Sequence, residues 1–351
     1  MDSRKPVLIT GAAGFIGFHI ALALLNNGQA VVGLDNVNQY YDPQLKWDRL
    51  GILAGNPLFR FVRLDLRDRD PMEDFFRKNS FVTVVHLAAQ AGVRYSITHP
   101  HDYIESNVCG FLNLLEGCRY GNVGHLVFAS SSSVYGANEK TPFSVHDNVD
   151  HPISFYAVTK KTNELMAHCY ANLYSLPCTG LRFFTVYGPW GRPDMALFLF
   201  TRAILAGEPI KIFNNGNMRR DFTYIDDVIG ALLKIIEKPP GQNPDWNRVV
   251  PDPGSSFAPY RVYNIGSNRP VELLHFINTI EDCLGMEAKK DFLPMQPGDV
   301  RETSADIQDL VRDFGFHPKT SIREGIASFV EWYLQYYRIG AGSKKVLSDR
   351  E

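Results

Sequence analysis

The sequence has few cysteines, and they form none of the patterns that bind zinc or cross-link a small secreted protein. There are five in 351 residues, an odd number, and no two stand in a Cys-x-x-Cys pair. They are Cys109, Cys118, Cys169, Cys178 and Cys283. Disulfide-linked domains and structural zinc sites both need suitably paired cysteines. We therefore expect a protein of a reducing compartment that holds no metal.

Long runs of basic and of apolar residues are also lacking. Lysine and arginine number 36 against 38 aspartates and glutamates, a net charge of −2, so we expect no nucleic-acid partner and no anionic membrane surface. No apolar run reaches the roughly 18 residues that span a bilayer. The first ten residues, MDSRKPVLIT, contain no apolar region like that of a signal peptide. The sequence therefore predicts a cytoplasmic protein without membrane contact.

A glycine-rich turn follows the first predicted strand. This strand, residues 7–10, is apolar and β-branched, as buried parallel strands are. It runs into Gly-x-x-Gly-x-x-Gly and then into a helix predicted over residues 16–27. Glycines let backbone N–H groups approach a diphosphate, and the helix N-terminus adds a positive dipole; a tight turn without a ligand is the alternative. The predicted cofactor contacts are Gly11, Gly14, Phe15, Ile16 and Gly17.

An acidic residue ends the second predicted strand, residues 30–34. Asp35 lies 18 residues after Gly17, close to the spacing at which a carboxylate binds the ribose hydroxyls of a dinucleotide. A carboxylate there repels a 2′-phosphate, which favours NAD over NADP. Asn36 follows directly and is placed in the same site. The sequence therefore predicts that the glycine turn and Asp35 bind NAD.

Three further segments are predicted to complete the cofactor site. The strand at 59–64 is followed by Asp65 and Leu66, which either flank an adenine or are simply the polar end of the strand. The strand at 82–87 is followed by small residues, against which a cofactor can lie. A helix over 102–119 carries an asparagine that orders the active-site region or satisfies a local carbonyl. The residues concerned are Asp65, Leu66, Ala88 and Asn107.

A tyrosine and a lysine stand four residues apart at the start of another predicted helix. Tyr156 and Lys160 share one helical face, so both side chains can point into one cleft. A nearby ammonium favours the phenolate and lowers the pKa of the phenol, which makes the pair an acid/base unit. The alternative is an aromatic anchor beside a solvated lysine.

Four serines, 130–133, follow the strand predicted at 125–129, where parallel sheets bind ligands.

The five strand–helix units, the glycine turn, the acid at position 35 and the Tyr/Lys pair together resemble the extended short-chain dehydrogenase/reductase family, and more narrowly its nucleotide-sugar epimerases. The resemblance covers nearly the whole chain. It implies an α/β fold, a Rossmann-type doubly wound parallel sheet with a smaller C-terminal α/β substrate domain. It also implies tightly bound NAD regenerated in each turnover, a UDP-sugar substrate and a role in polysaccharide biosynthesis. A homodimer is implied through the helices that begin near Asp102 and Ser154.

The boundary between the two domains is predicted at a stretch rich in proline and glycine that begins at Thr185. The NAD-binding domain then comprises residues 1–185. The nucleotide-sugar-binding domain comprises residues 186–342, with some segments returning to the first domain. Residues 343–351 are polar and are predicted to form a disordered tail.

The resemblance also assigns a catalytic hydroxyl and phosphate-binding residues. In the family the hydroxyl lies in Ser/Thr-x-x-Val-Tyr-Gly, which corresponds to Ser131, 25 residues before Tyr156, with one residue of latitude either way. Arg220 matches an Arg-Asp-Phe/Tyr segment in which arginine meets the diphosphate of a nucleotide sugar; a solvated charged strand is the alternative. Asp299 lies in a stretch that resembles the family's late substrate loop, and Arg301 after it is a weaker phosphate candidate.

Two serines bear on the type of reaction. Related dehydratases and decarboxylases carry acidic residues before Val-Tyr-Gly, whereas here both positions are serines, Ser132 and Ser133. The resemblance therefore implies an epimerase. In such enzymes the residue corresponding to Tyr156 takes the proton of the sugar C4 hydroxyl while hydride moves to NAD. The 4-keto sugar then turns over and takes the hydride back on its other face.

The segment around Arg192 bears on the choice of sugar. It resembles that of UDP-glucuronate 4-epimerases, in which arginine and hydroxyl donors, here Arg192 and Thr185, hold the C5 carboxylate. The alternative is an ordinary loop in which Arg192 pairs with Asp194. We expect interconversion of UDP-glucuronate and UDP-galacturonate; a UDP-glucose 4-epimerase and then a UDP-glucuronate decarboxylase are the alternatives. A nucleotide sensor without turnover would need the phosphate turn but not the whole Ser/Tyr/Lys set.

Overall fold

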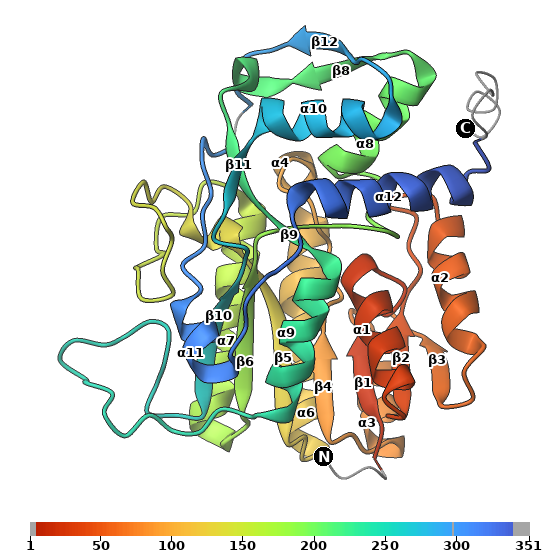
Figure 1. Ribbon diagram of the computed structural model, residues 1–351. Coiled ribbons are helices and arrows are strands. Elements are labelled where there is room, and N and C mark those ends of the chain that lie inside the picture. Colours follow the sequence, from red (N-terminus) through yellow and green to blue (C-terminus); the bar gives the residue numbers. More distant parts are fainter. Residues whose placement is uncertain (1–4, 297, 340–351) are drawn as a thin grey trace.

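A parallel sheet of seven strands forms the centre of the molecule (Figure 1). The computed structural model describes residues 5–296 and 298–339. The strands are β1 (Val7–Thr10), β2 (Val31–Asp35), β3 (Phe59–Arg63), β4 (Thr83–His86), β5 (His125–Ser131), β6 (Cys178–Phe183) and β10 (Tyr260–Ile265). Their order is β10-β6-β5-β4-β1-β2-β3, and all neighbours are parallel. The order reverses between β1 and β4, the point where such sheets bind ligands at their carboxyl ends.

Helices cover both faces of this sheet, which confirms the predicted doubly wound α/β class. One face carries α1 (Phe15–Asn26), α9 (Ile225–Glu237) and α11 (Gln308–Phe314), which form one apolar core layer with the strands. The other carries α3 (Arg69–Lys78), α6 (Gly110–Tyr120) and α7 (Phe155–Tyr174), with a second layer. Helix α2 (Gln44–Ala54) packs against α1 and the edge strand β3. Since both faces are covered, β1 and β4 are buried along their whole length.

A smaller α/β unit, drawn at the top of Figure 1, completes the fold. A three-stranded sheet has the order β11-β9-β7 and a two-stranded sheet the order β12-β8. These strands are β7 (Thr185–Tyr187), β8 (Pro209–Ile212), β9 (Arg219–Tyr224), β11 (Pro270–Glu272) and β12 (Lys289–Phe292). The helices are α8 (Ala196–Ala206), α10 (Leu273–Leu284) and α12 (Ile322–Tyr336). Their core is rich in aromatic rings, and Phe222 of β9 stacks on Phe276 of α10 with ring centroids 4.1 Å apart.

The chain crosses between the two units more than once. Elements β10, α9 and α11 all follow Thr185, yet they pack on the large sheet. The division of the chain at residue 185 therefore stays a prediction, as does its extension to residue 342. The tail predicted at 343–351 lies outside the described residues. In the parts of the chain that the structure describes, no helix has the length and apolar composition needed to cross a membrane.

The helix predicted over residues 102–119 is confirmed, and it contains a turn of a different helical type. The segment consists of α5 (Pro100–Tyr103), a π-helical turn (Ile104–Cys109) and α6, and it follows the short helix α4 (Tyr95–Thr98). Such a wider turn is often found at functional sites. Here it contains Asn107, whose side chain is buried.

Candidate active site

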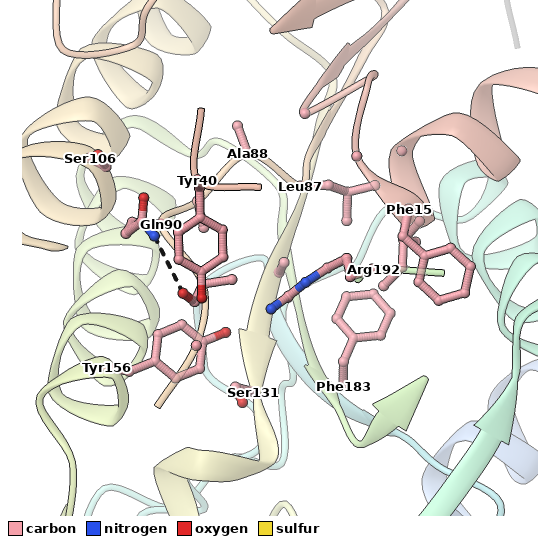
Figure 2. A pocket seen from close by; sticks show the side chains of 18 of the residues that line it. Phe15, Tyr40, Leu87, Ala88, Gln90, Ser106, Ser131, Tyr156, Phe183 and Arg192 are labelled. Atoms are coloured by element: carbon pink, nitrogen blue, oxygen red, sulfur yellow. Dashed lines mark hydrogen bonds between the residues drawn. The ribbon is translucent and has the colours of Figure 1, made fainter. Parts of the chain in front are cut away.

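A cavity of about 410 Å³ opens beside the carboxyl ends of the central strands (Figure 2). Most of the predicted site residues line it. They are Gly11, Gly14, Phe15, Ile16, Gly17, Asp35, Asn36, Asp65, Leu66, Ala88, Ser131, Ser132, Ser133, Tyr156, Lys160, Thr185 and Arg192. The structure thus brings together residues that are up to 181 positions apart in the sequence. Asn107, Arg220 and Asp299 are not part of its lining.

The glycine turn has the close backbone packing that a dinucleotide site requires. Gly11 has φ +74°, and a Cβ there would lie 2.7 Å from the Ala88 backbone nitrogen. A Cβ on Gly17 would lie 2.0 Å from the Gly11 carbonyl oxygen. Helix α1 begins at Phe15 without a side-chain cap, which leaves its first N–H groups available for an anion. The residues present therefore fit a bound diphosphate.

Asp35 supports this turn as well as lining the cavity. Its Oδ2 accepts a hydrogen bond from the Ala13 N–H at 3.1 Å, and its Oδ1 accepts one from the Val37 N–H at 2.8 Å. Burial raises the pKa of this carboxyl, and the two N–H donors only partly offset that effect. Beside it, Asn36 donates to Asp65 at 2.9 Å. The arrangement places two acidic groups in the wall where the ribose and adenine of NAD are predicted.

Tyr156 and Lys160 both reach the cavity from the first turns of α7. Ser154 caps this helix by accepting from the Ala157 N–H at 3.2 Å. The Lys160 ammonium nitrogen lies 5.9 Å from the centre of the Tyr156 ring and donates to the Ala129 carbonyl at 2.9 Å. Burial lowers the pKa of Lys160 to about 8. The i, i+4 spacing therefore places both groups in one wall.

The electrostatics of Tyr156 differ from the expectation. Burial raises the pKa of the phenol, and the charge of Arg192 and a hydrogen bond with Ser131 lower it only in part. Lys160, whose ammonium group donates to the Ala129 carbonyl, is not among the groups that lower it. The cation that acts on the phenol is Arg192, which Figure 2 shows extending toward Tyr156 from across the cavity.

Strand β5 runs two residues further than predicted, and this sets the directions of the serines. Ser130 is buried and donates to the Glu164 carboxylate at 2.7 Å. Ser131 contacts Tyr156, donates to the Ser133 hydroxyl at 3.1 Å and accepts from the Ser133 N–H at 3.1 Å. Ser131 is therefore the serine whose geometry suits the predicted catalytic hydroxyl.

A buried ion pair lies beneath the serines, and the sequence did not single it out. Glu164 accepts from Arg182 Nε at 2.8 Å and Nη2 at 2.9 Å, and both side chains are at most 3% exposed. The charge of Arg182 and its hydrogen bonds hold the pKa of Glu164 below its ordinary value despite burial. The only signal in the sequence was that Glu164 stands four residues after Lys160, on the same face of α7.

Asn107 lies behind the cavity wall. Its side chain accepts from the Gln90 N–H at 2.8 Å and donates to the Gln90 carbonyl at 3.0 Å and to the Thr159 hydroxyl at 3.1 Å. Thr159 in turn donates to the Tyr156 carbonyl at 2.9 Å. The geometry thus suits the predicted ordering of the tyrosine region, whereas Ser106 rather than Asn107 lines the cavity.

Arg192 occupies the wall opposite α7 and is paired with a carboxylate. Its Nε lies 3.0 Å from Asp194 Oδ1 and its Nη2 lies 2.5 Å from Oδ2. Tyr40 donates to the same Asp194 oxygen at 3.3 Å. The pairing that the sequence left as an alternative is therefore present, and Arg192 still lines the cavity with Thr185. Tyr40 was missed, since it stands 154 positions before Asp194.

Arg220 and Asp299 do not line this cavity, and Asp299 lines a second cavity of about 890 Å³. Arg220 donates to the Val300 carbonyl at 2.5 Å and the Arg301 carbonyl at 3.1 Å. Arg94, which the sequence did not single out, pairs with Asp299 at 2.9 Å and lies over the Phe213 ring at 4.4 Å. Arg94 and Arg220 therefore both lie close to Asp299.

No group of three or more His, Cys, Asp or Glu side chains within the described ranges has the arrangement of a metal site. Hydroxyl groups, carboxylates and the three cations Lys46, Lys160 and Arg192 line the cavity. Such a set suits proton transfer and the binding of phosphate and carboxylate groups.

Comparisons with known proteins identify the family. The model of the NAD dependent epimerase/dehydratase family matches residues 7–266. Protein CapI of Staphylococcus aureus is 55% identical, over 95% of this chain and 99% of that protein. A probable UDP-glucuronate 4-epimerase of Rhizobium meliloti is 49% identical, over 94% and 97%. The crystal structure of UDP-glucuronic acid 4-epimerase from Bacillus cereus with UDP-glucuronic acid and NAD matches with a TM-score of 0.83 and 32% identity, over 95% of this chain and 100% of that one. The chain therefore belongs to the NAD-dependent epimerase/dehydratase family.

Proposed function

We propose that the protein is an NAD-dependent 4-epimerase that interconverts UDP-glucuronate and UDP-galacturonate. The observation that carries the proposal is the set of residues that line one cavity. Tyr156, a hydroxyl cluster and Arg192 face the same space, and the positions at which related enzymes carry acidic residues are Ser132 and Ser133. The same substrate is supported by a probable UDP-glucuronate 4-epimerase and by a UDP-glucuronic acid 4-epimerase, both of which resemble this chain over nearly its whole length.

The reaction needs a base, a hydride acceptor and space for the sugar to turn. Bound NAD supplies reversible hydride acceptance at C4. Tyr156, as its phenolate, would take the proton of the C4 hydroxyl, and Ser131, whose hydrogen bond lowers the pKa of the phenol, would stabilise that phenolate. The 4-keto sugar would then rotate, and Tyr156 would return the proton to the C4 oxygen when the hydride is given back on the other face by NAD held in this site. The net change is the configuration at C4.

Arg192 gives the site its preference for a sugar acid. A guanidinium fork matches a carboxylate in a bidentate manner, and Thr185 and Ser133, which carry hydroxyl groups, line the same cavity. Holding the carboxylate close to the ring plane prevents loss of CO₂ from the 4-keto acid. Asp194 is the internal partner that the substrate carboxylate must compete with. A neutral UDP-hexose would leave the Arg192–Asp194 pair undisturbed.

The decisive experiment is turnover without added cofactor. Purified protein is incubated with UDP-glucuronate, and the UDP-sugars are resolved. The proposal requires UDP-galacturonate to form and denatured protein to release NAD. A UDP-pentose as the main product would indicate a decarboxylase instead. Inactivity on the acid together with formation of UDP-galactose from UDP-glucose would indicate the neutral-sugar epimerase.

We further propose a cytoplasmic homodimer joined through α6 and α7. Apolar side chains on these helices support this, since Leu165 and Leu173 are 59% and 61% exposed and Leu112 of α6 is 43% exposed. The free thiols of all five cysteines suit a reducing compartment. Light scattering on wild type and Leu165→Glu tests the dimer: the variant is expected to be monomeric, and an unchanged mass would place the interface elsewhere.

A further inference from the structure

Arg49 of α2 is a buried cation, and its hydrogen-bond partners among the described residues are uncharged carbonyl and hydroxyl groups. Its side chain is completely buried, and in the described parts of the chain no carboxylate forms an ion pair with it. Its Nε has no hydrogen-bond partner there. The nearby Asp35 carboxylate interacts with this charge without forming an ion pair, so the cost of burying the guanidinium is only partly offset. Such a residue calls for a reason beyond packing.

The guanidinium of Arg49 joins two segments that bind different parts of the reacting complex. On one side Nη1 donates to the Ala13 carbonyl of the phosphate turn at 2.8 Å and to the Tyr41 hydroxyl at 2.9 Å. On the other side Nη2 donates to the carbonyls of Trp190 and Gly191 at 2.6 and 3.2 Å. The next residue after Gly191 is Arg192. The guanidinium of Arg49 thus connects the glycine turn, through Ala13, with the loop that carries Arg192, which we call the carboxylate-binding loop.

The turn that Arg49 holds has a strained conformation. Gly188 to Gly191 form a β-turn closed by a 3.1 Å hydrogen bond from the Gly191 N–H to the Gly188 carbonyl. Trp190, at its third position, has φ +59°, where glycine or asparagine is usual. Its ring packs on Phe18, Trp332 and Tyr336, with centroids 5.2 to 5.5 Å away. Such a conformation persists where the surroundings over-determine it.

The opposite end of the fork is equally fixed. The Ala13 carbonyl accepts the hydrogen bond from Arg49, and the N–H of the same residue donates to Asp35 at 3.1 Å. A shift of the phosphate turn would therefore be transmitted through Arg49 to the Trp190 carbonyl and from there to the adjacent Arg192. A lysine could not make both sets of contacts, because its single ammonium group cannot reproduce the two arms of the fork.

We propose that Arg49 is a positioning residue that couples the dinucleotide turn to the carboxylate-binding loop, so that Arg192 is presented to the sugar acid in register with the cofactor. The coupling rests on the proposed function, because it assumes that Arg192 receives the substrate carboxylate. It has a reciprocal consequence. If the phosphate turn favours the binding-competent loop, a ligand carboxylate on Arg192 favours retention of NAD to the same extent.

A double-mutant cycle tests the coupling. The variants are Arg49→Met, Arg192→Ala and their combination, assayed on UDP-glucuronate with NAD added to saturation. We expect Arg49→Met alone to lower kcat/KM by about 10- to 100-fold, as misplacement of a binding group does, and to raise the share of CO₂-releasing turnovers. In the Arg192→Ala background, Arg49→Met should lower kcat/KM by less than about threefold. If the loss of kcat/KM in the double variant equals the product of the losses in the two single variants, the two residues act independently and the proposal is overturned.

Controls separate this outcome from general damage and from a wrong substrate. Arg77→Met removes a cation whose side chain is 75% exposed, and it should leave kcat/KM and product ratio unchanged. If Arg49→Met does not fold, Tyr41→Phe removes one contact of the fork while keeping the ring; it should raise CO₂ release in wild type but not beside Arg192→Ala, and an equal rise in both would refute the coupling. Wild-type inactivity on UDP-glucuronate would instead refute the proposed function.

Discussion

Replacing Arg192 by alanine removes the group on which the choice of substrate depends. Arg192 and Asp194 form a bidentate pair with distances of 3.0 and 2.5 Å, and their side chains are 25% and 28% exposed. The substrate carboxylate must take over part of this contact. The variant loses the fork for the carboxylate and leaves Asp194, an anion, close to the place where the carboxylate is proposed to bind.

The magnitude follows from the hydrogen bonds that are lost. A hydrogen bond to a charged group contributes about 1.5–3 kcal/mol, so kcat/KM for UDP-glucuronate should fall by about 10- to 150-fold. Asp194 already satisfies the fork in the free enzyme, which favours the lower part of this range. The charge of Arg192 also lowers the pKa of Tyr156, so the variant should react more slowly with any substrate at neutral pH. Only the difference between an acidic and a neutral sugar reports on carboxylate binding.

The assay therefore compares two substrates at one pH. UDP-glucose is measured as a substrate or, where turnover is too slow, as a competitive inhibitor of the acid. We expect the acid to lose at least about tenfold more than the neutral sugar, with UDP-pentose appearing by decarboxylation. Arg202→Ala, which removes an exposed arginine of α8, is the matched control. Equal losses on both sugars would show that Arg192 supports the loop generally, and the argument for a uronate substrate would lose its basis.

Three further predictions concern chemistry and stability. Tyr156→Phe should lower kcat by on the order of 10²-fold or more with unchanged NAD content, and near wild-type turnover would exclude Tyr156 as the base. Glu164→Gln leaves Arg182 buried without its anion and should lower the free energy of unfolding by about 3–5 kcal/mol in urea titrations; a loss under about 1 kcal/mol would contradict this. Burial lowers the pKa of His146, but the contacts with Asp252 and Asp309 outweigh it and raise the pKa above the ordinary value of 6.5. The stability that wild type gains over His146→Gln should therefore be full below pH 6.5 and fade as the pH rises through the raised pKa; a gain that grows with pH would contradict it.

Features that depend on neighbouring residues were predicted well from the sequence. The glycine turn requires three glycines within seven residues, and the close backbone contacts at Gly11 and Gly17 explain that spacing. Tyr156 and Lys160 share a face because α7 is regular from Phe155 onward. The parallel sheet followed from short apolar strands that alternate with helices. Each of these inferences rests on a local periodicity, which the backbone enforces.

Contacts between distant segments could not be predicted in this way. Arg49 reaches Trp190 across 141 positions, and Tyr40 reaches Asp194 across 154. Arg94 meets Asp299 across 205 positions. No spacing rule relates such residues, because their approach depends on how the loops of the two units fold over the sheet edge. The sequence indicated the residue types of the site but not the side chains that fix their positions.

The protonation of Tyr156 shows why this distinction affects the chemistry. Spacing alone predicted that Lys160 lies beside the ring, and it does, at 5.9 Å from the centroid. The direction of the pKa shift depends on two quantities that spacing does not contain. One is burial, which raises the pKa of the phenol, and the other is which charged group acts on the phenol oxygen. Arg192, 36 positions away, then becomes the cation that lowers the pKa. The residue proposed to hold the substrate carboxylate thereby also affects the base. Binding of the sugar acid should neutralise the charge of Arg192, and this should raise the pKa of Tyr156 and disfavour its phenolate form.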